Sequence, residues 1–128
     1  MYSHNHEFAL PPSLKPYRDE IASQYKAVEF RKIRYSVFPA DSCIRLPGGD
    51  VGKVVNIVKL KSKECLLVYK VFKKRQPYFT YPRDSQALGI SQVGHLSSFT
   101  LTVPITDCTK AWLLPLEDGS RYVAIDLL

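Results

Sequence analysis

Residues Asp50 to Phe72 read Asp-Val-Gly-Lys-Val-Val-Asn-Ile-Val-Lys-Leu-Lys-Ser-Lys-Glu-Cys-Leu-Leu-Val-Tyr-Lys-Val-Phe, and this stretch decides the fold. β-Branched and other apolar side chains recur through both of its halves at largely strand-like spacing. Ser62-Lys63 separates the halves at the point where a two-residue reversal would fall. The stretch therefore predicts a β-hairpin, with Val55, Ile57 and Val68 turned inward.

The hairpin also accounts for the charge of the chain. Between Lys59 and Arg75 there are seven basic residues and one acid, a net charge of +6, which equals that of all 128 residues. Lys59, Lys61 and Lys63 alternate, so we expect them to project outward from one face of a strand. Two interpretations are open: the lysines follow a phosphate backbone, or they protect an edge strand from aggregation.

Further short strands are predicted on both sides of the hairpin. One spans Val28 to Val37, with a slip at Arg31-Lys32 that a β-bulge would absorb. A proline-marked loop from Lys73 to Ser85 follows the hairpin, and we place Trp112 in the core. The other predicted elements are a turn at 47–50, a helical turn at 84–89, and strands at 41–46, 90–93, 99–103, 111–116 and 122–128.

Seven or eight short strands joined by tight turns predict an all-β fold with minor α content, a small twisted β-barrel. A chain of 128 residues suits one domain. Its polar start is punctuated by prolines and predicts a flank or strap over residues 1–26, with a short helix from Tyr17 to Tyr25. The barrel domain then covers residues 27–128.

The cysteines and histidines exclude several classes of protein. Cys43, Cys65 and Cys108 are too few and too widely spaced for a disulfide framework or a zinc site, so we expect three reduced core thiols in an intracellular protein. His4 and His6 read as part of a solvated terminus, and we expect no metal and no cofactor. Neither a signal peptide nor a run of about 20 apolar residues is present, which predicts neither secretion nor membrane spanning.

The groups that catalysis needs are not gathered anywhere in the sequence. The three histidines are scattered, no serine has a nucleophile-elbow setting, and there is no glycine-rich phosphate loop. We therefore expect neither enzymatic activity nor a small-molecule substrate, and a binding role remains.

Three segments carry a resemblance to a known family: Asp41-Ser-Cys-Ile-Arg-Leu, Gly52-Lys-Val-Val-Asn-Ile-Val and Leu67-Val-Tyr-Lys-Val-Phe. Together with the later strands they resemble the bromo-adjacent-homology (BAH) domain, a β-barrel module of chromatin proteins, over about Val28 to Leu128. The chain is also similar to terminal β-domains of mobile-element-derived animal proteins. The family's Glu-rich segment is missing here, so the resemblance implies a barrel and a nuclear role but no ligand site.

Two surfaces are candidates for binding. One is a loop with three rings, Tyr78, Phe79 and Tyr81, which form a cage for a methylated lysine, a platform for stacked bases, or a seal over one end of the barrel. The other is a basic face made of Arg31, Lys32, Arg34, Lys59, Lys61, Lys63, Lys73, Lys74 and Arg75.

We expect a non-catalytic, chromatin-associated interaction module that presents the basic hairpin and the aromatic loop to a histone or another nuclear protein. One alternative is a domain that binds DNA or RNA directly with the same basic face. A second alternative is an architectural or oligomerisation domain of a larger protein. A nuclear or cytoplasmic location is expected, with no membrane partner.

Overall fold

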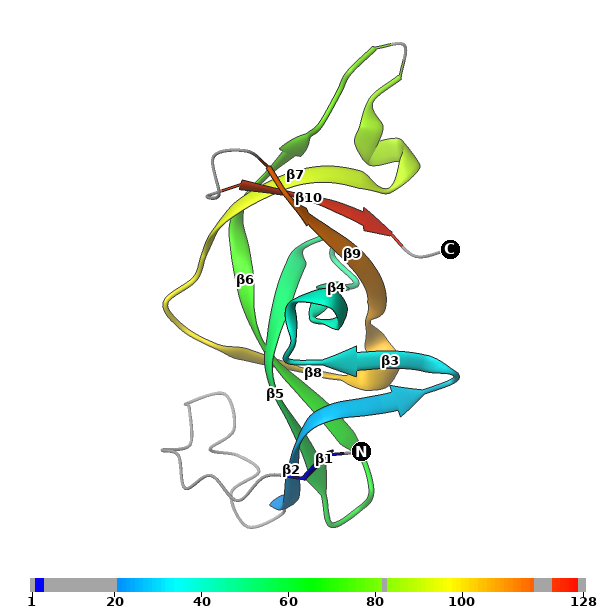
Figure 1. The fold of residues 1–128 in the computed structure, drawn as a ribbon, viewed down its shortest axis with the longest axis vertical. Helices are drawn as coiled ribbons and strands as arrows, with labels where there is room; N and C mark the ends of the chain where they lie inside the picture. Colours follow the sequence, from blue (N-terminus) through cyan, green and yellow to red (C-terminus); the bar gives the residue numbers. More distant parts are fainter. Residues whose placement is uncertain (1, 4–20, 82, 117–120, 127–128) are drawn as a thin grey trace.

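Strands β5 (Val51–Leu60) and β6 (Cys65–Pro77) form the predicted antiparallel hairpin, which runs along much of the long axis of the molecule (Figure 1). The computed structural model describes residues 2–3, 21–81, 83–116 and 121–126. The hairpin turn is one residue longer than expected, because the Leu60 N–H donates to the Glu64 carbonyl and Lys63 takes a φ of 73°. A three-residue loop closed by a left-handed residue is a common hairpin connection.

Both hairpin strands change neighbours halfway along. The outer edge of β5 pairs first with β4 (Cys43–Arg45) and then with β2 (Ile21–Phe30). The outer edge of β6 pairs first with β8 (Leu101–Pro104) and then with β7 (Ile90–Leu96). Each hairpin strand therefore belongs to two different parts of the fold.

The upper half of the molecule in Figure 1 is a closed ring of strands. β7 pairs with β10 (Arg121–Asp126), β10 with β9 (Thr109–Pro115), and β9 with β4, which returns to β5. This circuit of β4, β5, β6, β7, β10 and β9 confirms the predicted all-β, barrel-like fold. Its interior is filled by Cys43, Val51, Phe72, Val93, Ala111 and Ala124.

The lower half is an open lobe. It consists of β2, β3 (Ile33–Ser36), the lower halves of β5 and β6, and β8, and it is not closed by strand pairing between β2 and β8. Its core contains Val28, Tyr35, Ile44, Leu46, Val54, Ile57, Leu67, Tyr69, Val103, Ile105 and Cys108. The short 3-10 helix η4 (Ile105–Asp107) leads from β8 to β9. An open seam remains between β2 on one side and β8 with η4 on the other.

Two local features allow the hairpin to change neighbours. In β5 the pairing steps from Val54 opposite Tyr69 to Asn56 opposite Val68, so Val55 is the extra residue of a β-bulge. In β6, Val71 lies between the segments that face β8 and β7. Ser97 there donates its N–H to the Val71 carbonyl at 2.8 Å and accepts the Val71 N–H on Oγ at 3.1 Å.

The hairpin side chains divide between the two faces differently from the prediction. Val55 was predicted to face inward, but the bulge leaves it 39% exposed. Lys59 was predicted to face outward, but it lies two residues after the buried Ile57 and therefore shares its inner face. Val68 lies on the opposite face in a second buried cluster with Val58, Leu60 and Leu66. Both faces of the lower hairpin are thus buried, and the exposed part is the turn.

The segment predicted as one bulged strand, Val28 to Val37, is a hairpin. β2 ends at Phe30, β3 begins at Ile33, and Arg31 and Lys32 form the turn with φ angles of 51° and 65°. Two consecutive positive φ angles are the mark of a type I′ turn, where asparagine and glycine are favoured. The alternation of apolar side chains cannot distinguish such a turn from a bulge.

The helix predicted from Tyr17 to Tyr25 is wrong over its described part. Ile21 to Tyr25 begin β2 and pair with β5, while the part before Ile21 lies outside the described residues. Pairing with a long neighbouring strand outweighs weak helical spacing. β2 also crosses the expected boundary between residues 26 and 27, and β1 (Tyr2–Ser3) pairs with it.

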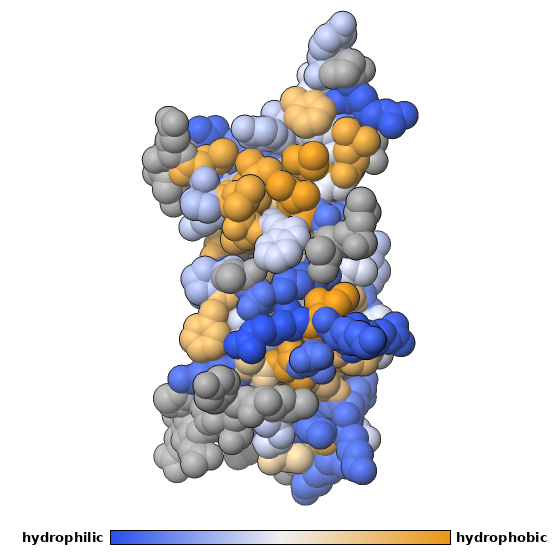
Figure 2. All heavy atoms as spheres, turned by 45° about the vertical axis from the view of Figure 1, so that its right-hand side comes forward, coloured by the Kyte–Doolittle hydropathy of each residue, from blue (hydrophilic) through white to orange (hydrophobic). Residues whose placement is uncertain are grey.

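Trp112 is not a core residue. Ala111 and Leu113 of β9 face the ring interior, so alternation places Trp112 on the outer wall, where it is 45% exposed. Leu114 is exposed on the same wall. Figure 2 shows apolar side chains gathered in the upper half of the molecule, the part built by β7, β9 and β10.

The short 3-10 helix η3 (Ser85–Leu88) confirms the predicted helical turn. The Asp84 carboxylate accepts the Gln86 N–H at 2.8 Å, and Gly89 ends the turn with a φ of 76°. A further 3-10 helix, η2 (Pro39–Asp41), precedes β4. Among the described residues no helix has the length and apolar character to cross a membrane.

We predict that Gly52→Ala lowers the free energy of unfolding by about 1–3 kcal/mol, because overpacking of a core has costs of this order. A Cβ atom at Gly52 would lie 2.6 Å from Cδ2 of Tyr69. Urea denaturation measures the effect. Gly48→Ala is the matched control, since nothing lies within 4 Å of a Cβ there. Equal stability of the two variants would contradict the close packing of β5 against Tyr69.

We also predict that the double variant Arg31→Asn, Lys32→Gly raises the free energy of unfolding by about 1 kcal/mol, because it relieves two unfavourable backbone conformations. Thermal unfolding at fixed ionic strength is the measurement. Lys61→Gly removes one charge from a turn position that has no positive φ, so it should bring no gain. A double variant that melts no higher than the parent would refute the prediction.

Candidate functional site

The structure divides the predicted basic face into three groups (Figure 1). Lys59, Lys61 and Lys63 lie at the lower end of the hairpin, and Arg31 and Lys32 form the β2–β3 turn. A third group lies in the upper half of the molecule and contains Lys73, Lys74 and Arg75. The first two groups lie on the open lobe, and the third is separated from them.

The third group lies on a strand instead of the predicted loop. β6 continues to Pro77, and its upper part pairs with β7. Lys73 lies 5.9 Å from the Phe99 ring, whereas the guanidinium group of Arg75 lies close to Gly49. Since neighbouring residues of a strand point to opposite faces, the three cations do not share one face.

Arg34 belongs to an ion-pair network, although its side chain is 52% exposed. Its Nε lies 3.3 Å from one carboxylate oxygen of Asp41, and Lys110 Nζ lies 2.5 Å from the other. Lys110 also donates to the Arg34 carbonyl at 2.8 Å and lies 5.2 Å from the Trp112 ring. This network joins β3, η2 and β9, so we assign Arg34 a structural role.

The predicted aromatic loop lies at the end of the molecule opposite to the hairpin turn (Figure 1). The Tyr78 and Phe79 rings meet edge to face at 6.4 Å, while Tyr81 is 87% exposed. The buried Ser85 Oγ accepts the N–H groups of Tyr78 and Phe79 at 2.7 and 3.1 Å. The described loop thus presents a pair of rings and a solvated tyrosine, an arrangement that does not enclose a cation.

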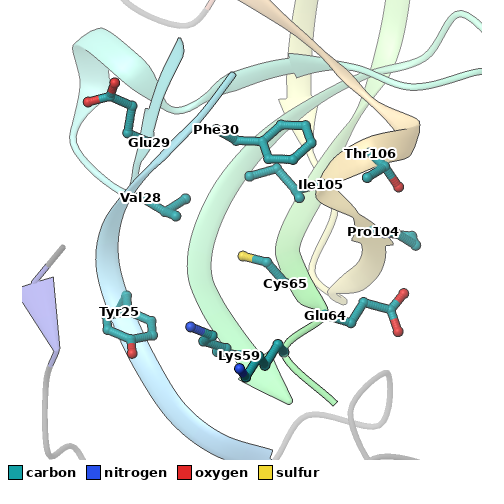
Figure 3. Close-up of a pocket in the computed structure, with 11 residues that line it drawn as sticks. Tyr25, Val28, Glu29, Phe30, Lys59, Glu64, Cys65, Pro104, Ile105 and Thr106 are labelled. Carbon is teal, nitrogen blue, oxygen red and sulfur yellow. The ribbon is translucent and has the colours of Figure 1, made fainter. Parts of the chain in front are cut away.

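Lys59 and Lys63 line a groove in the open seam, and Arg31 lies 4.8 Å from the ring of Phe30, which also lines it. Its volume is about 270 Å³, and Figure 3 shows its side chains. They come from β2, from the adjoining ends of β5 and β6 with the turn between them, and from β8 with η4. The lining residues are Tyr25, Val28, Glu29, Phe30, Lys59, Lys63, Glu64, Cys65, Pro104, Ile105 and Thr106.

The floor of the groove is apolar. Val28 and Cys65 point toward its middle, and Phe30 and Ile105 lie together at its upper end (Figure 3). Val28 and Ile105 belong to the core of the open lobe, and Phe30 packs against it. The groove is therefore the part of that core that the unclosed seam leaves accessible.

The lower end of the groove is positive. Lys59 extends beside the Tyr25 ring, whereas the carboxylates of Glu29 and Glu64 point away from the middle (Figure 3). The Tyr25 hydroxyl accepts a hydrogen bond from Ser23 Oγ at 3.0 Å. A cation thus lies at one end of an apolar floor.

The pKa of the Cys65 thiol reflects both the burial of the groove floor and the charge beside it. Burial raises the pKa of its thiol to about 11, and the nearby positive charge of Lys59 opposes that rise. Cys43 and Cys108 are more deeply buried, and burial raises the pKa of each to about 12. All three are free thiols, as predicted, and at neutral pH they are protonated and weakly nucleophilic.

The groove combines an apolar floor with the cations of Lys59 and Lys63. Within residues 2–3, 21–81, 83–116 and 121–126, no group of three or more His, Cys, Asp and Glu side chains is arranged to hold a metal ion. Sequence reasoning found Lys59 and Lys63 but missed Tyr25, Phe30 and Ile105. No spacing signal links these three, because the fold brings them together from β2 and η4 across a seam.

Comparison with known proteins gives one result. No curated protein and no solved structure matches the chain. A family model described as a domain of unknown function, DUF8592, matches residues 4–127. Since the match spans almost the whole sequence, the chain belongs to the DUF8592 family.

Proposed function

We propose that this chain is a non-catalytic interaction module that binds a nuclear protein partner at the open lobe. The observation that carries the proposal is the position of two basic turns, at Arg31-Lys32 and at Lys61 to Lys63, near an accessible apolar groove. An apolar centre with a charged rim is the usual composition of a protein interface.

The groove favours a protein over a nucleic acid at this site. A phosphate backbone is bound by cations and hydrogen-bond donors, and an apolar floor adds nothing to that contact. A protein segment can use the apolar floor and the cations together.

Charge favours an acidic partner surface. The chain has a net charge of +6, so a basic histone tail would meet like charge at both turns. The resemblance to BAH domains supports a chromatin component as the partner and the nucleus as the location. In that case the contact would use an acidic surface of a chromatin protein instead of a methylated tail.

The strained turn supports a contact role for its cations. Arg31 and Lys32 occupy positions where asparagine and glycine would be favoured, and both have positive φ angles. Backbone strain of this kind persists more often at functional sites. The Arg31 guanidinium also lies 4.8 Å from the Phe30 ring, which lines the groove.

A direct DNA- or RNA-binding domain is the second candidate. It is favoured by Lys73, Lys74 and Arg75, which are exposed on the upper part of β6, away from the groove. The two functions therefore use different parts of the chain, and variants can separate them.

We predict that the triple variant Lys32→Glu, Lys61→Glu, Lys63→Glu loses the partner that the parent chain retains from a nuclear extract. The reversed charges remove the electrostatic complementarity near the groove without touching buried residues. The measurement is the bound protein fraction after nuclease treatment, identified by mass spectrometry.

The matched control reverses Lys73, Lys74 and Arg75 to Glu and should retain the protein partner. Retention by the first variant equal to that of the parent would exclude the open lobe as the contact surface. Retention that disappears on nuclease treatment, together with loss of duplex binding in the control variant, would instead support the nucleic-acid function.

A further inference from the structure

We propose that the groove binds an acidic peptide segment, in which an apolar side chain covers the floor and a neighbouring carboxylate pairs with Lys59. This inference rests on the proposed function and specifies the chemistry of the partner segment.

Lys110 and Lys59 are both at least partly buried, and they differ in their partners. Lys110 is buried, and its ammonium group contacts the Asp41 carboxylate, the Arg34 carbonyl and the Trp112 ring. The ion pairs among the described residues are Arg34–Asp41, Arg45–Asp126 and Lys110–Asp41, and Lys59 takes part in none of them.

Lys59 is partly buried on the inner face of β5, directly opposite Cys65 in the pairing of β5 with β6. A partly desolvated ammonium group is stabilised by a carboxylate that comes within hydrogen-bonding distance. The groove is open beside it, so an external carboxylate can supply the contact that Asp41 supplies to Lys110.

The apolar floor defines the second half of the ligand. At about 270 Å³ the groove lies just below the range for ligand pockets, roughly 300–1,000 Å³. It therefore suits one or two apolar side chains of an extended segment. Val28, Phe30 and Ile105 would cover them with aliphatic and aromatic surface.

The turns around the groove explain why further acids in the segment would help. Lys61 and Lys63 are exposed at the hairpin turn, and Arg31 is exposed at the other turn. Exposed charges of this kind mainly raise association rates and select partners of the opposite sign. A segment with an apolar centre and acidic flanks thus matches the groove and both turns.

The test uses a defined probe, the capped peptide acetyl-Asp-Glu-Leu-Phe-Glu-Asp-amide, titrated into the full chain and followed through backbone amide NMR shifts. We expect shifts at Val28, Cys65 and Ile105 with a dissociation constant in the millimolar range or tighter. Lys59→Met keeps the aliphatic stem and should weaken binding at least about tenfold, because a charge-assisted contact is lost. Lys61→Met removes the same charge at the exposed turn and should weaken binding by less than about threefold.

Two control peptides separate the contribution of the acidic side chains from that of the apolar side chains. Replacing every acid with its amide should abolish the shifts, and replacing Leu-Phe with Ala-Ala should do the same. Shifts that are as large with the amide peptide, that map away from the groove, or that saturate at the same peptide concentration in Lys59→Met as in the parent would overturn the inference. No shift at saturating millimolar peptide would also overturn it.

The Cys65 thiol provides an independent measurement. Iodoacetamide should modify the partly exposed Cys65 faster than Cys43 and Cys108, which are buried and serve as internal controls. The acidic peptide should slow modification of Cys65 in proportion to occupancy and leave the other two rates unchanged. A Cys65 rate that does not respond to bound peptide would place the peptide elsewhere.

The two proposals can fail separately. If the peptide does not occupy the groove but charge reversal at the turns still abolishes retention of the nuclear partner, the interaction function stands and the acidic-segment inference falls. If the peptide binds as expected while the turn variant retains its partner, the groove chemistry stands and the proposed interaction surface is wrong.

Discussion

The pairing of both outer edges of the β5–β6 hairpin is the constraint on which the rest of the structure depends. β4 and β2 share one edge, and β8 and β7 share the other. This arrangement requires a change of neighbour within each strand, and the bulge at Val55 and the two reciprocal hydrogen bonds between Ser97 and Val71 provide it. The hairpin therefore holds a closed ring at one end and an open lobe at the other.

The open lobe carries the groove that can bind a partner. The interior of the closed ring is filled by packed side chains, which include the small side chains of Ala111 and Ala124. The unclosed seam leaves part of the other core accessible, with Lys59 at its lower end. The Lys110 ammonium group contacts a carboxylate and a carbonyl, whereas Lys59 takes part in no ion pair among the residues that the structure describes.

The basic residues serve more than one purpose. Arg34 stabilises the junction of β3, η2 and β9 through Asp41, and Arg75 lies against the β4–β5 turn at Gly49. Arg31, Lys32, Lys61 and Lys63 are exposed near the groove, where their charges can attract an oppositely charged partner. A net charge concentrated in one stretch of sequence thus becomes several distinct surfaces after folding.

The sequence alone determined the hairpin, the all-β class, the free thiols and the helical turn that ends at Gly89, because alternation, turn residues and capping are local and leave a pattern in consecutive positions. It did not determine the faces of Val55 and Lys59, since a one-residue bulge reverses which side an alternating pattern presents. The groove was equally unpredictable, because Phe30 and Ile105 meet only through the curvature of a sheet that stops short of closing. Tertiary structure decided these features through long-range strand pairing, which no local spacing records.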